Sequence, residues 1–308
     1  MSLRAAILLF LLPSSLSAAV LDLPATPYQV SVETETAPVG ASAAYLVRFP
    51  SPLRSPFPAN DTVWGHLILP RGPGPYACVL VLPVMAAPNV WIETQFMRRM
   101  TAEGLAVLWL EMPYQFHRRT GALVPSGQVF LARTAKHLAA NFRQSILDAR
   151  RALDWLANRP EIDPRRVGIF GVSLGALVGS AVYSVDAHPR YAVFLLGGAD
   201  FPTLVYASAM TGPFIKKLQV TPAALREAWR GLDPLDYRDR NAGKQVLLVN
   251  ASWDAVIPAS NARRLREAFP DARQLWVPFG HYSALLHLFW IPRYVAGDLA
   301  AHLSIKKR

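Results

Sequence analysis

The stretch that most constrains this chain runs from residue 167 to residue 176. There, an apolar segment meets the pattern Gly-x-Ser-x-Gly and then a run of small residues. The two flanks are typical of a buried strand and of a helix start, which would put Ser173 on a tight turn with its hydroxyl exposed in a cleft. Gly171 and Gly175 fit such a turn, because backbone passing close by leaves no room for a Cβ. The pattern alone should occur by chance in roughly one chain in ten of this length, so its meaning depends on the residues that follow.

An acid and a histidine follow in a suitable order. A serine hydroxyl is a poor nucleophile unless a base takes its proton, and the base needs a carboxylate to orient it. Asp254 lies on the loop after a predicted strand at 246–250, and His281 lies on the loop after the next predicted strand, at 273–277. Since open α/β sheets bind ligands at the carboxyl ends of their strands, we expect Ser173, Asp254 and His281 to meet there.

Each of these residues also has an alternative interpretation. Ser173 as an ordinary helix N-cap would explain the serine but not both glycines. Asp200, which follows a predicted strand at 191–196, is the rival to Asp254, although the Val-Ile-Pro after Asp254 favours the latter. The remaining candidate acids and histidines are predicted to be structural or without an evident partner: Asp233, Asp236, His66, His137, His188, His287 and His302.

The order of predicted elements indicates an α/β protein. Alternating or short segments come first, and from residue 77 onward continuous apolar runs alternate with helical segments. This pattern predicts a mostly parallel sheet with helices on both faces, preceded by antiparallel strands. We expect one domain over residues 20–308, with a small cap or insertion near 200–242. The expected strands are 28–36, 43–49, 62–69, 77–84, 105–112, 166–170, 191–196, 245–250 and 273–277, and the expected helices are 91–103, 136–158, 174–183, 259–269 and 282–302, the last bent or broken at Pro292.

Two segments before the serine carry a family resemblance. Residues 148–156 (DARRALDWL) and 162–169 (IDPRRVGI), followed by GVSLG, are similar to the dienelactone hydrolase, acetyl xylan esterase and prolyl oligopeptidase-like branch of the α/β-hydrolase superfamily. The resemblance covers roughly residues 60–303. It implies an α/β-hydrolase fold with Ser173 as nucleophile, His281 as general base and then acid, and Asp254 as the orienting acid.

That resemblance implies a serine hydrolase, and we expect a carboxylic-ester hydrolase acting on a small-molecule ester. A peptidase or an acyltransferase with the same three residues is the nearest alternative, and a non-catalytic binding protein of the same fold is another. Fewer than about 60 residues precede the sheet core in this sequence, so we do not expect the N-terminal propeller usual in prolyl oligopeptidase-type peptidases.

The oxyanion-stabilising loop departs from the superfamily's usual pattern. One N–H donor should be that of Leu174, and the second should come from the loop after the strand at 77–84. The superfamily often has His-Gly or Gly-Gly there, whereas this chain has Pro-Val-Met-Ala-Ala-Pro at 83–88. Because proline has no N–H, Val84 or Met85 is the predicted donor.

The connection at 113–135 contains a basic segment that should border the same site. His117, Arg118 and Arg119 follow the strand at 105–112. The simpler interpretation is a solvated basic loop. The alternative is that these residues contact an anionic part of the substrate.

Composition and charge narrow the partners, disulfides and cofactors that this chain is expected to have. The net charge of +11 comes from scattered arginines, without a nucleic-acid-binding motif, so we expect no nucleic-acid partner. A basic surface would suit anionic substrates or membrane surfaces, or reflect only an arginine-rich proteome. Cys78 is the one cysteine, which excludes an internal disulfide, and its apolar surroundings predict a buried, inert thiol. No metal or cofactor motif is present, none is needed for this chemistry, and the oligomeric state is left open.

Residues 1–19 are typical of a secretory signal peptide. Arg4 supplies a positive start, residues 5–12 form an apolar run, and 16–19 (Leu-Ser-Ala-Ala) offer small residues for cleavage. The apolar run is too short to span a bilayer, which needs about 20 residues. The sequence therefore predicts export to the periplasm or the medium, with a frayed N-terminus or an uncleaved anchor as alternatives.

Overall fold

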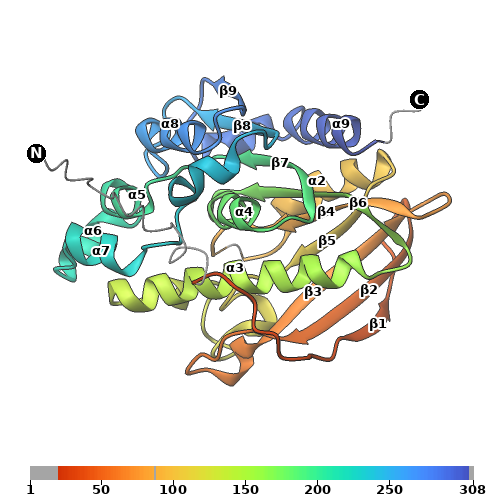
Figure 1. Ribbon diagram of the computed structural model, residues 1–308, viewed down its shortest axis with the longest axis horizontal. Helices are drawn as coiled ribbons and strands as arrows, with labels where there is room; N and C mark the ends of the chain where they lie inside the picture. Colours follow the sequence, from red (N-terminus) through yellow and green to blue (C-terminus); the bar gives the residue numbers. More distant parts are fainter. Residues whose placement is uncertain (1–19, 87, 305–308) are drawn as a thin grey trace, which may run out of the picture.

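The computed structural model describes residues 20–86 and 88–304, and within them nine strands form a single sheet (Figure 1). Their order across the sheet is β1-β2-β3-β5-β4-β6-β7-β8-β9. The strands are β1 (Ser31–Glu35), β2 (Ala41–Pro50), β3 (Thr62–Pro70), β4 (Tyr76–Leu82), β5 (Ala106–Leu110), β6 (Ile162–Val172), β7 (Pro189–Leu195), β8 (Val246–Ala251) and β9 (Arg273–Val277).

The direction of the strands changes at β5. The pairs β1–β2, β2–β3 and β3–β5 are antiparallel, whereas every pair from β5 through β4 to β9 is parallel. Buried and partly exposed residues alternate along β3, while β5 is buried throughout. This is the difference expected between a strand covered on one face and a strand covered on both. The predicted α/β-hydrolase fold, with antiparallel strands before a mostly parallel sheet, is confirmed.

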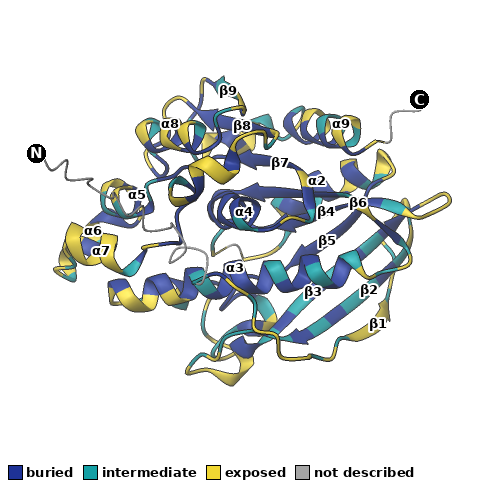
Figure 2. Ribbon diagram, viewed as in Figure 1, coloured by how far each residue is buried: buried dark blue, intermediate teal, exposed yellow. Residues whose placement is uncertain are grey.

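Helices cover both faces of the parallel part of the sheet. On one face lie α3 (Ala135–Ala157), α4 (Leu174–Val185) and α8 (Ala259–Ala268), and on the other lie α2 (Trp91–Ala102) and α9 (Ile291–Leu303). Neighbouring residues of β6 point to opposite faces, since Ile169 packs into one core and Phe170 into the other. Figure 2 shows the resulting buried centre, with exposed residues on the outer helix faces and loops.

The segment near 200–242 forms a small cap of short helices beside the start of α3 (Figure 1). The cap contains α5 (Phe201–Ala207), α6 (Gly212–Lys217), α7 (Pro222–Ala228) and the 3-10 segment η4 (Pro234–Asn241). Asp233 anchors it, because its carboxylate accepts hydrogen bonds from the N–H groups of Phe201 (2.6 Å) and Leu235 (2.9 Å). Burial raises the pKa of Asp233 to about 6. Asp233 is thus a structural residue, as the sequence predicts.

The C-terminal helix is broken rather than bent. A 3-10 turn, η5 (Ser283–His287), is followed by α9, whose first turn contains Pro292. A proline there costs nothing, because N–H groups of a first turn have no acceptor within the helix. The helix expected over 282–302, bent or broken at Pro292, is thus broken, and the break lies just before this proline.

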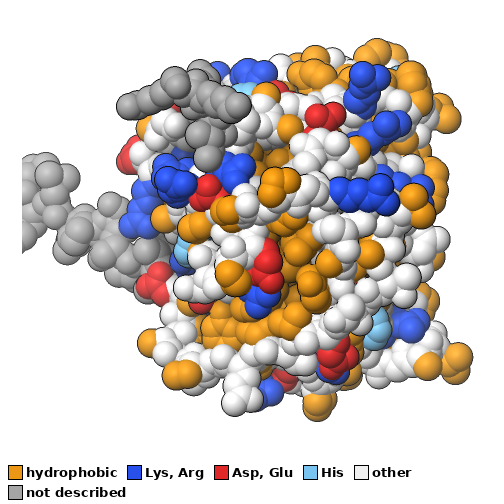
Figure 3. Space-filling view, turned by 90° about the vertical axis from the view of Figure 1, so that its right-hand side faces the viewer, with side chains coloured by type: hydrophobic (Ala, Val, Ile, Leu, Met, Phe, Trp, Pro, Cys, Tyr) orange, Lys and Arg blue, Asp and Glu red, His pale blue; other side chains and the backbone are white. Residues whose placement is uncertain are grey.

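Cys78 is buried in β4, where burial raises the pKa of its thiol to about 12. On the face seen in Figure 3, Lys and Arg side chains lie in separate groups among hydrophobic and uncharged ones. In the part of the chain that the structure describes, no helix is both long enough and apolar enough to cross a bilayer. The predicted signal peptide at 1–19 lies outside the described residues.

Candidate active site

Ser173 lies on the turn between β6 and α4, in a strained backbone conformation with φ 53° and ψ −113°. The turn fits closely against its neighbours. A Cβ on Gly171 would lie 2.2 Å from the carbonyl oxygen of Gly175, and a Cβ on Gly175 would lie 2.0 Å from that of Leu82. Both glycines are therefore required by close backbone approach, as the sequence predicts.

The three residues expected to meet form one hydrogen-bonded row. The hydroxyl Oγ of Ser173 lies 3.0 Å from Nε2 of His281, and Nδ1 of the same imidazole lies 2.8 Å from Oδ2 of Asp254. The other carboxylate oxygen of Asp254 accepts hydrogen bonds from the N–H groups of Val256 (2.8 Å) and Ile257 (2.7 Å). These two bonds fix the carboxylate, and the carboxylate in turn fixes the imidazole.

The carboxylate that contacts His281 belongs to Asp254, and no hydrogen bond joins its rival Asp200 to this histidine. Asp200 has a left-handed backbone (φ 61°) and precedes α5, where its carbonyl accepts a hydrogen bond from the Leu204 N–H. The loops that carry Asp254 and His281 are joined to each other, because the Trp253 N–H donates to the carbonyl of Phe279 (3.0 Å). Geometry therefore favours the acid that the sequence favoured.

The loop after β4 is held by two buried side chains that the sequence pattern does not predict. The N–H of Val84 donates to Oε1 of Glu93 (2.9 Å), and the carbonyl of Val84 accepts from Nε2 of Gln115 (2.8 Å). Both side chains are 1% exposed, and burial raises the pKa of Glu93. The prediction of Val84 as a free donor is wrong, because its N–H already has an acceptor.

Met85 is the remaining candidate for the N–H donor of this loop. The Val84 carbonyl and the Met85 N–H belong to one planar peptide unit and point in opposite directions. With the carbonyl fixed on Gln115, the direction of the Met85 N–H is fixed too. No described residue accepts a hydrogen bond from this N–H, nor from that of Leu174 at the start of α4, where such groups have no acceptor within the helix.

The basic segment after β5 supports the fold instead of facing the serine. Arg118 is fully buried, and its guanidinium donates to Oδ2 of Asp148 (2.7 Å) and to the carbonyls of Asn60 (2.7 Å) and Glu111 (2.9 Å). The expectation that Arg118 contacts the substrate is wrong, because its side chain is fully buried and each guanidinium nitrogen donates a hydrogen bond within the protein.

The two neighbours of Arg118 are also engaged locally. Nδ1 of His117 lies 2.5 Å from Oε1 of Glu111, and its ring stacks on Trp64. Nε of Arg119 donates to the carbonyl of Phe116 (2.9 Å). Both side chains line a surface depression over residues 116–122 that does not include Ser173.

Two apolar cavities meet at Ser173. We call the first the cap cavity: it has a volume of about 60 Å³ and lies between α3, α4 and the cap. The second, the α9 cavity, has a volume of about 230 Å³ and lies between the strand ends, α2, η5 and α9. Met85, Ser173 and Met210 line both. The cap cavity is lined further by Leu138, Phe142, Leu174, Leu177, Leu204 and Trp229, and the α9 cavity by Val84, Ile92, Phe96, His281, Leu285 and Leu288.

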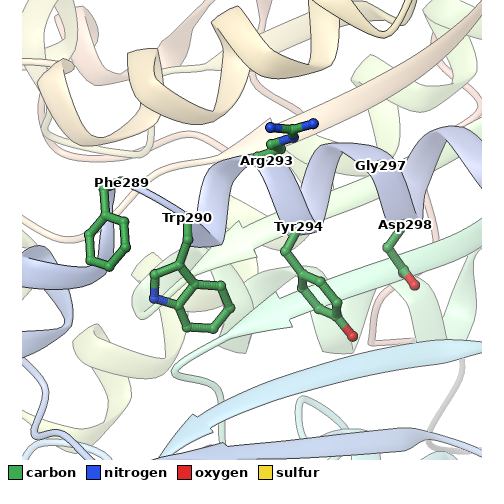
Figure 4. Close-up of a pocket in the computed structure, with 6 residues that line it drawn as sticks. All are labelled: Phe289, Trp290, Arg293, Tyr294, Gly297 and Asp298. Atoms are coloured by element: carbon green, nitrogen blue, oxygen red, sulfur yellow. The ribbon is translucent and has the colours of Figure 1, made fainter.

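A third depression lies on the outer face of α9 and is separate from the site (Figure 4). Phe289, Trp290 and Tyr294 line it, and none of its lining residues lines either cavity at Ser173. Its one carboxylate, Asp298, accepts hydrogen bonds from Tyr191 and Arg273. The one carboxylate of this depression is therefore already engaged. Among residues 20–86 and 88–304, no cluster of three or more His, Cys, Asp or Glu side chains is arranged to hold a metal ion.

The sequence that carries these residues matches a known protein family. The sequence pattern of the prolyl oligopeptidase family matches residues 127–290, more than half of the chain. The chain belongs to the prolyl oligopeptidase family. The matched range contains Ser173, Asp254 and His281 but not the loop after β4.

Solved structures share the fold of this family member at low sequence identity. Acetyl xylan esterase 1 from Thermoanaerobacterium sp. aligns over 92% of both chains, with a TM-score of 0.68 and 18% identity. The acylaminoacyl peptidase of Pyrococcus horikoshii aligns with 89% of this chain but 40% of its own, with a TM-score of 0.59 and 14% identity.

Curated relatives of this family member match over shorter segments. An uncharacterized protein of Mycobacterium tuberculosis is 29% identical over 127 residues, which is 41% of each chain. The α/β-hydrolase domain-containing protein WAV2 of Arabidopsis thaliana is 26% identical over 152 residues, 46% of this chain and 47% of the relative. The match thus spans less than half the length of these relatives. Together with the family match, the comparisons support a hydrolase of the α/β-hydrolase fold.

Proposed function

We propose that this chain is a serine esterase, which cleaves a carboxylic ester through an acyl-enzyme. The observation that carries the proposal is the hydrogen-bonded row of Ser173, His281 and Asp254 where two apolar cavities meet. The row has the nucleophile, base and orienting acid that acyl transfer by a serine requires. Structural neighbours named as esterases add support for this reaction class.

In the proposed reaction, Oγ of Ser173 attacks the ester carbonyl carbon while Nε2 of His281 takes the hydroxyl proton. The tetrahedral intermediate collapses when the bond to the alcohol oxygen breaks, and His281 returns the proton to that oxygen. Water then attacks the acyl-enzyme with His281 again as base, which releases the carboxylic acid and restores Ser173. Asp254 holds the Nδ1–H tautomer and stabilises the imidazolium formed in each half.

The negative charge on the former carbonyl oxygen needs donors that are already oriented. We assign this role to the N–H groups of Leu174 and Met85. Their lack of an acceptor within the described residues, and their position beside Ser173, support the assignment. The hydrogen bonds of Val84 with Glu93 and Gln115 would hold this loop in the conformation that glycines allow in other hydrolases.

A fluorophosphonate probe tests the nucleophile directly, because it phosphonylates activated serines. We expect the wild-type protein to be labelled at Ser173 and to hydrolyse p-nitrophenyl acetate, and Ser173→Ala to lose both properties. Ser184→Ala is the matched control, since Ser184 lies on the same helix with its hydroxyl bonded to the Ser180 carbonyl. An unlabelled but folded wild-type protein, or labelling that persists in Ser173→Ala, would refute the proposal.

A peptidase remains the alternative, and the family match is the observation that favours it. The same row of side chains would attack an amide, with His281 giving its proton to the leaving amine. N-acetylalanine p-nitroanilide and N-acetylalanine methyl ester share one acyl group and separate the two activities. We expect the ester to have the higher kcat/KM by more than the difference in their intrinsic reactivities, and faster amide cleavage would favour the peptidase.

We also propose that the chain is exported after cleavage of residues 1–18 or 1–19. Support comes from the Arg4 start, the short apolar run and the small residues at 16–19. Expression of the full chain in a Gram-negative bacterium tests this by mass spectrometry of the periplasmic protein. A mature N-terminus at Ala19 or Val20 is expected, and an intact Met1 in the cytoplasm would contradict it.

A further inference from the structure

The two cavities at Ser173 differ in which catalytic groups they contain. His281 lines the α9 cavity and not the cap cavity, whereas Leu174 lines the cap cavity and not the α9 cavity. An ester bound at Ser173 has an acyl arm and an alcohol arm. These two arms must therefore lie differently with respect to the general acid, His281.

The path of the proton decides which arm enters which cavity. When the acyl-enzyme forms, Nε2 of His281 must deliver its proton to the alcohol oxygen, so this oxygen lies on the His281 side. General acid catalysis requires hydrogen-bond reach between the two atoms. The alcohol arm thus extends into the α9 cavity. The acyl arm then points to the other side of Ser173, over Leu174 and into the cap cavity.

The volumes of the cavities are unequal. The α9 cavity is nearly four times as large as the cap cavity. Buried aromatic rings form one wall of the cap cavity, where Phe142 and Trp229 pack with centroids 4.8 Å apart and Trp229 is 3% exposed. The α9 cavity is open at its rim, where Tyr282 is 67% exposed and Leu285 is 43% exposed.

The walls of both cavities are mainly apolar. Among the residues that the structure describes, no Asp, Glu, Lys or Arg side chain lines either one. In the cap cavity, the hydroxyl of Thr211 already donates to the carbonyl of Val205 (2.6 Å). Burying the hydroxyls of a sugar or the charge of an acid without partners costs free energy, so such groups are poorly matched here.

We propose that the substrate is an ester of a short apolar acyl group and a larger apolar alcohol, with the alcohol bound in the α9 cavity. This rests on the proposed esterase function. It gives the two cavities separate roles, the cap cavity limiting the acyl chain and the α9 cavity selecting the alcohol.

Hexyl acetate and ethyl hexanoate test this assignment because they are isomers with an alkoxide leaving group in both. Hexyl acetate has two acyl carbons and six alcohol carbons, whereas ethyl hexanoate has six acyl carbons and two alcohol carbons. We expect kcat/KM for hexyl acetate to exceed that for ethyl hexanoate by about tenfold or more, since even one methylene in an apolar pocket changes specificity by about tenfold. Rates are measured with a pH-stat. An equal or reversed preference would overturn the proposal.

Two cavity variants locate the effect. Ala284→Phe, in the α9 cavity, should lower the ratio of the two kcat/KM values, and Leu204→Ala, in the cap cavity, should lower the same ratio by admitting the hexanoyl chain. The first acts by slowing hexyl acetate and the second by accelerating ethyl hexanoate, so the changed substrate identifies the cavity. Fluorophosphonate labelling and circular dichroism establish that each variant is folded with a reactive serine. The proposal would be overturned if Ala284→Phe changed the rate for ethyl hexanoate alone and Leu204→Ala changed the rate for hexyl acetate alone.

Failure of this inference differs from failure of the esterase proposal. A wild-type protein that reacts with the fluorophosphonate and hydrolyses ethyl hexanoate preferentially is an esterase with the cavities assigned in reverse. A protein that is labelled but hydrolyses neither isomer contradicts the inferred substrate class. A protein without labelling or hydrolysis contradicts both.

Discussion

The loops after β6, β8 and β9 and the loops after β4 and β5 meet at one site but are built in different ways. In the first group, each reactive side chain lies on its own strand-to-helix loop, and short local contacts aim it at the next. In the second group, the ionisable side chains point away from Ser173, and two buried side chains hold the backbone of residue 84. The first group supplies the reactive groups, whereas the second orients a peptide unit.

The largest expected effect falls on the first group. Asp254→Asn should lower kcat by about 10⁴, because an amide there favours the wrong imidazole tautomer; this magnitude is the one known for the equivalent change in a serine protease. Steady-state kinetics with p-nitrophenyl acetate measure it.

Asp200→Asn is the matched control, since it makes the same change in the rival acid. It should leave kcat within about twofold, because no hydrogen bond joins the Asp200 side chain to His281 and Asn tolerates the left-handed backbone of this position as Asp does. A large loss in Asp200→Asn together with a small one in Asp254→Asn would reverse the assignment of the acid.

The next effect concerns stability in the second group. Arg118→Met should reduce the free energy of unfolding by about 3–5 kcal/mol, because it leaves the buried carboxylate of Asp148 without its charged partner. Burial already raises the pKa of Asp148. Urea denaturation followed by circular dichroism measures the change.

The double variant Arg118→Met/Asp148→Leu should recover much of this loss, since replacing both partners of a buried ion pair by apolar groups is often neutral. A single variant as stable as the wild type, with a raised KM for acidic esters alone, would return Arg118 to the substrate-binding role.

A smaller effect, on kcat rather than on stability, is expected for Gln115 in the second group. Gln115→Glu keeps the side chain's shape but removes the Nε2 donor that holds the Val84 carbonyl. We expect kcat to fall by about 10²-fold with little change in KM, because an oxyanion donor acts mainly in the transition state.

Gln144→Glu provides the matched control for this change. Gln144 is also buried, and it bonds to Asn60 and Ser51 away from the loop after β4. Its replacement should lower stability without lowering kcat at a temperature where the protein is folded. Equal losses of kcat in both variants would mean that Gln115 has a general structural role only.

The contrast between the two groups explains what could be predicted from the sequence. Ser173 and its glycines were predictable because the constraint is local: a tight turn, a Cβ with no room and a strand before a helix. Asp254 and His281 followed because parallel strands place their carboxyl ends at one edge of the sheet. The fold followed from the same alternation of strands and helices.

The residues of the second group could not be assigned in this way. Arg118 pairs with Asp148, thirty residues away, and also bonds to the carbonyl of residue 60. Gln115, which follows β5, reaches Val84, which follows the neighbouring strand β4. Such contacts depend on the register of packed elements, and a basic residue beside a site has the same appearance in the sequence whether it faces inward or outward. The Glu at position 93, on a helix that follows the loop, was the one available signal.

The smallest expected effect concerns Arg119, which keeps part of its surface exposed. Its removal lowers the net positive charge by one at a depression that does not include Ser173. Single exposed charges are screened over about 8 Å at physiological ionic strength, so Arg119→Ala should change kcat/KM by less than about twofold for both monohexyl succinate and hexyl acetate. The two esters share an alcohol, and the succinate ester has a longer acyl group that carries a negative charge. Comparing their ratio between wild type and variant cancels the effect of acyl length, and measuring both esters on one preparation cancels changes in protein concentration or stability. A KM that rises for the succinate ester alone would show that the loop after β5 takes part in substrate recognition as well as in support of the loop after β4.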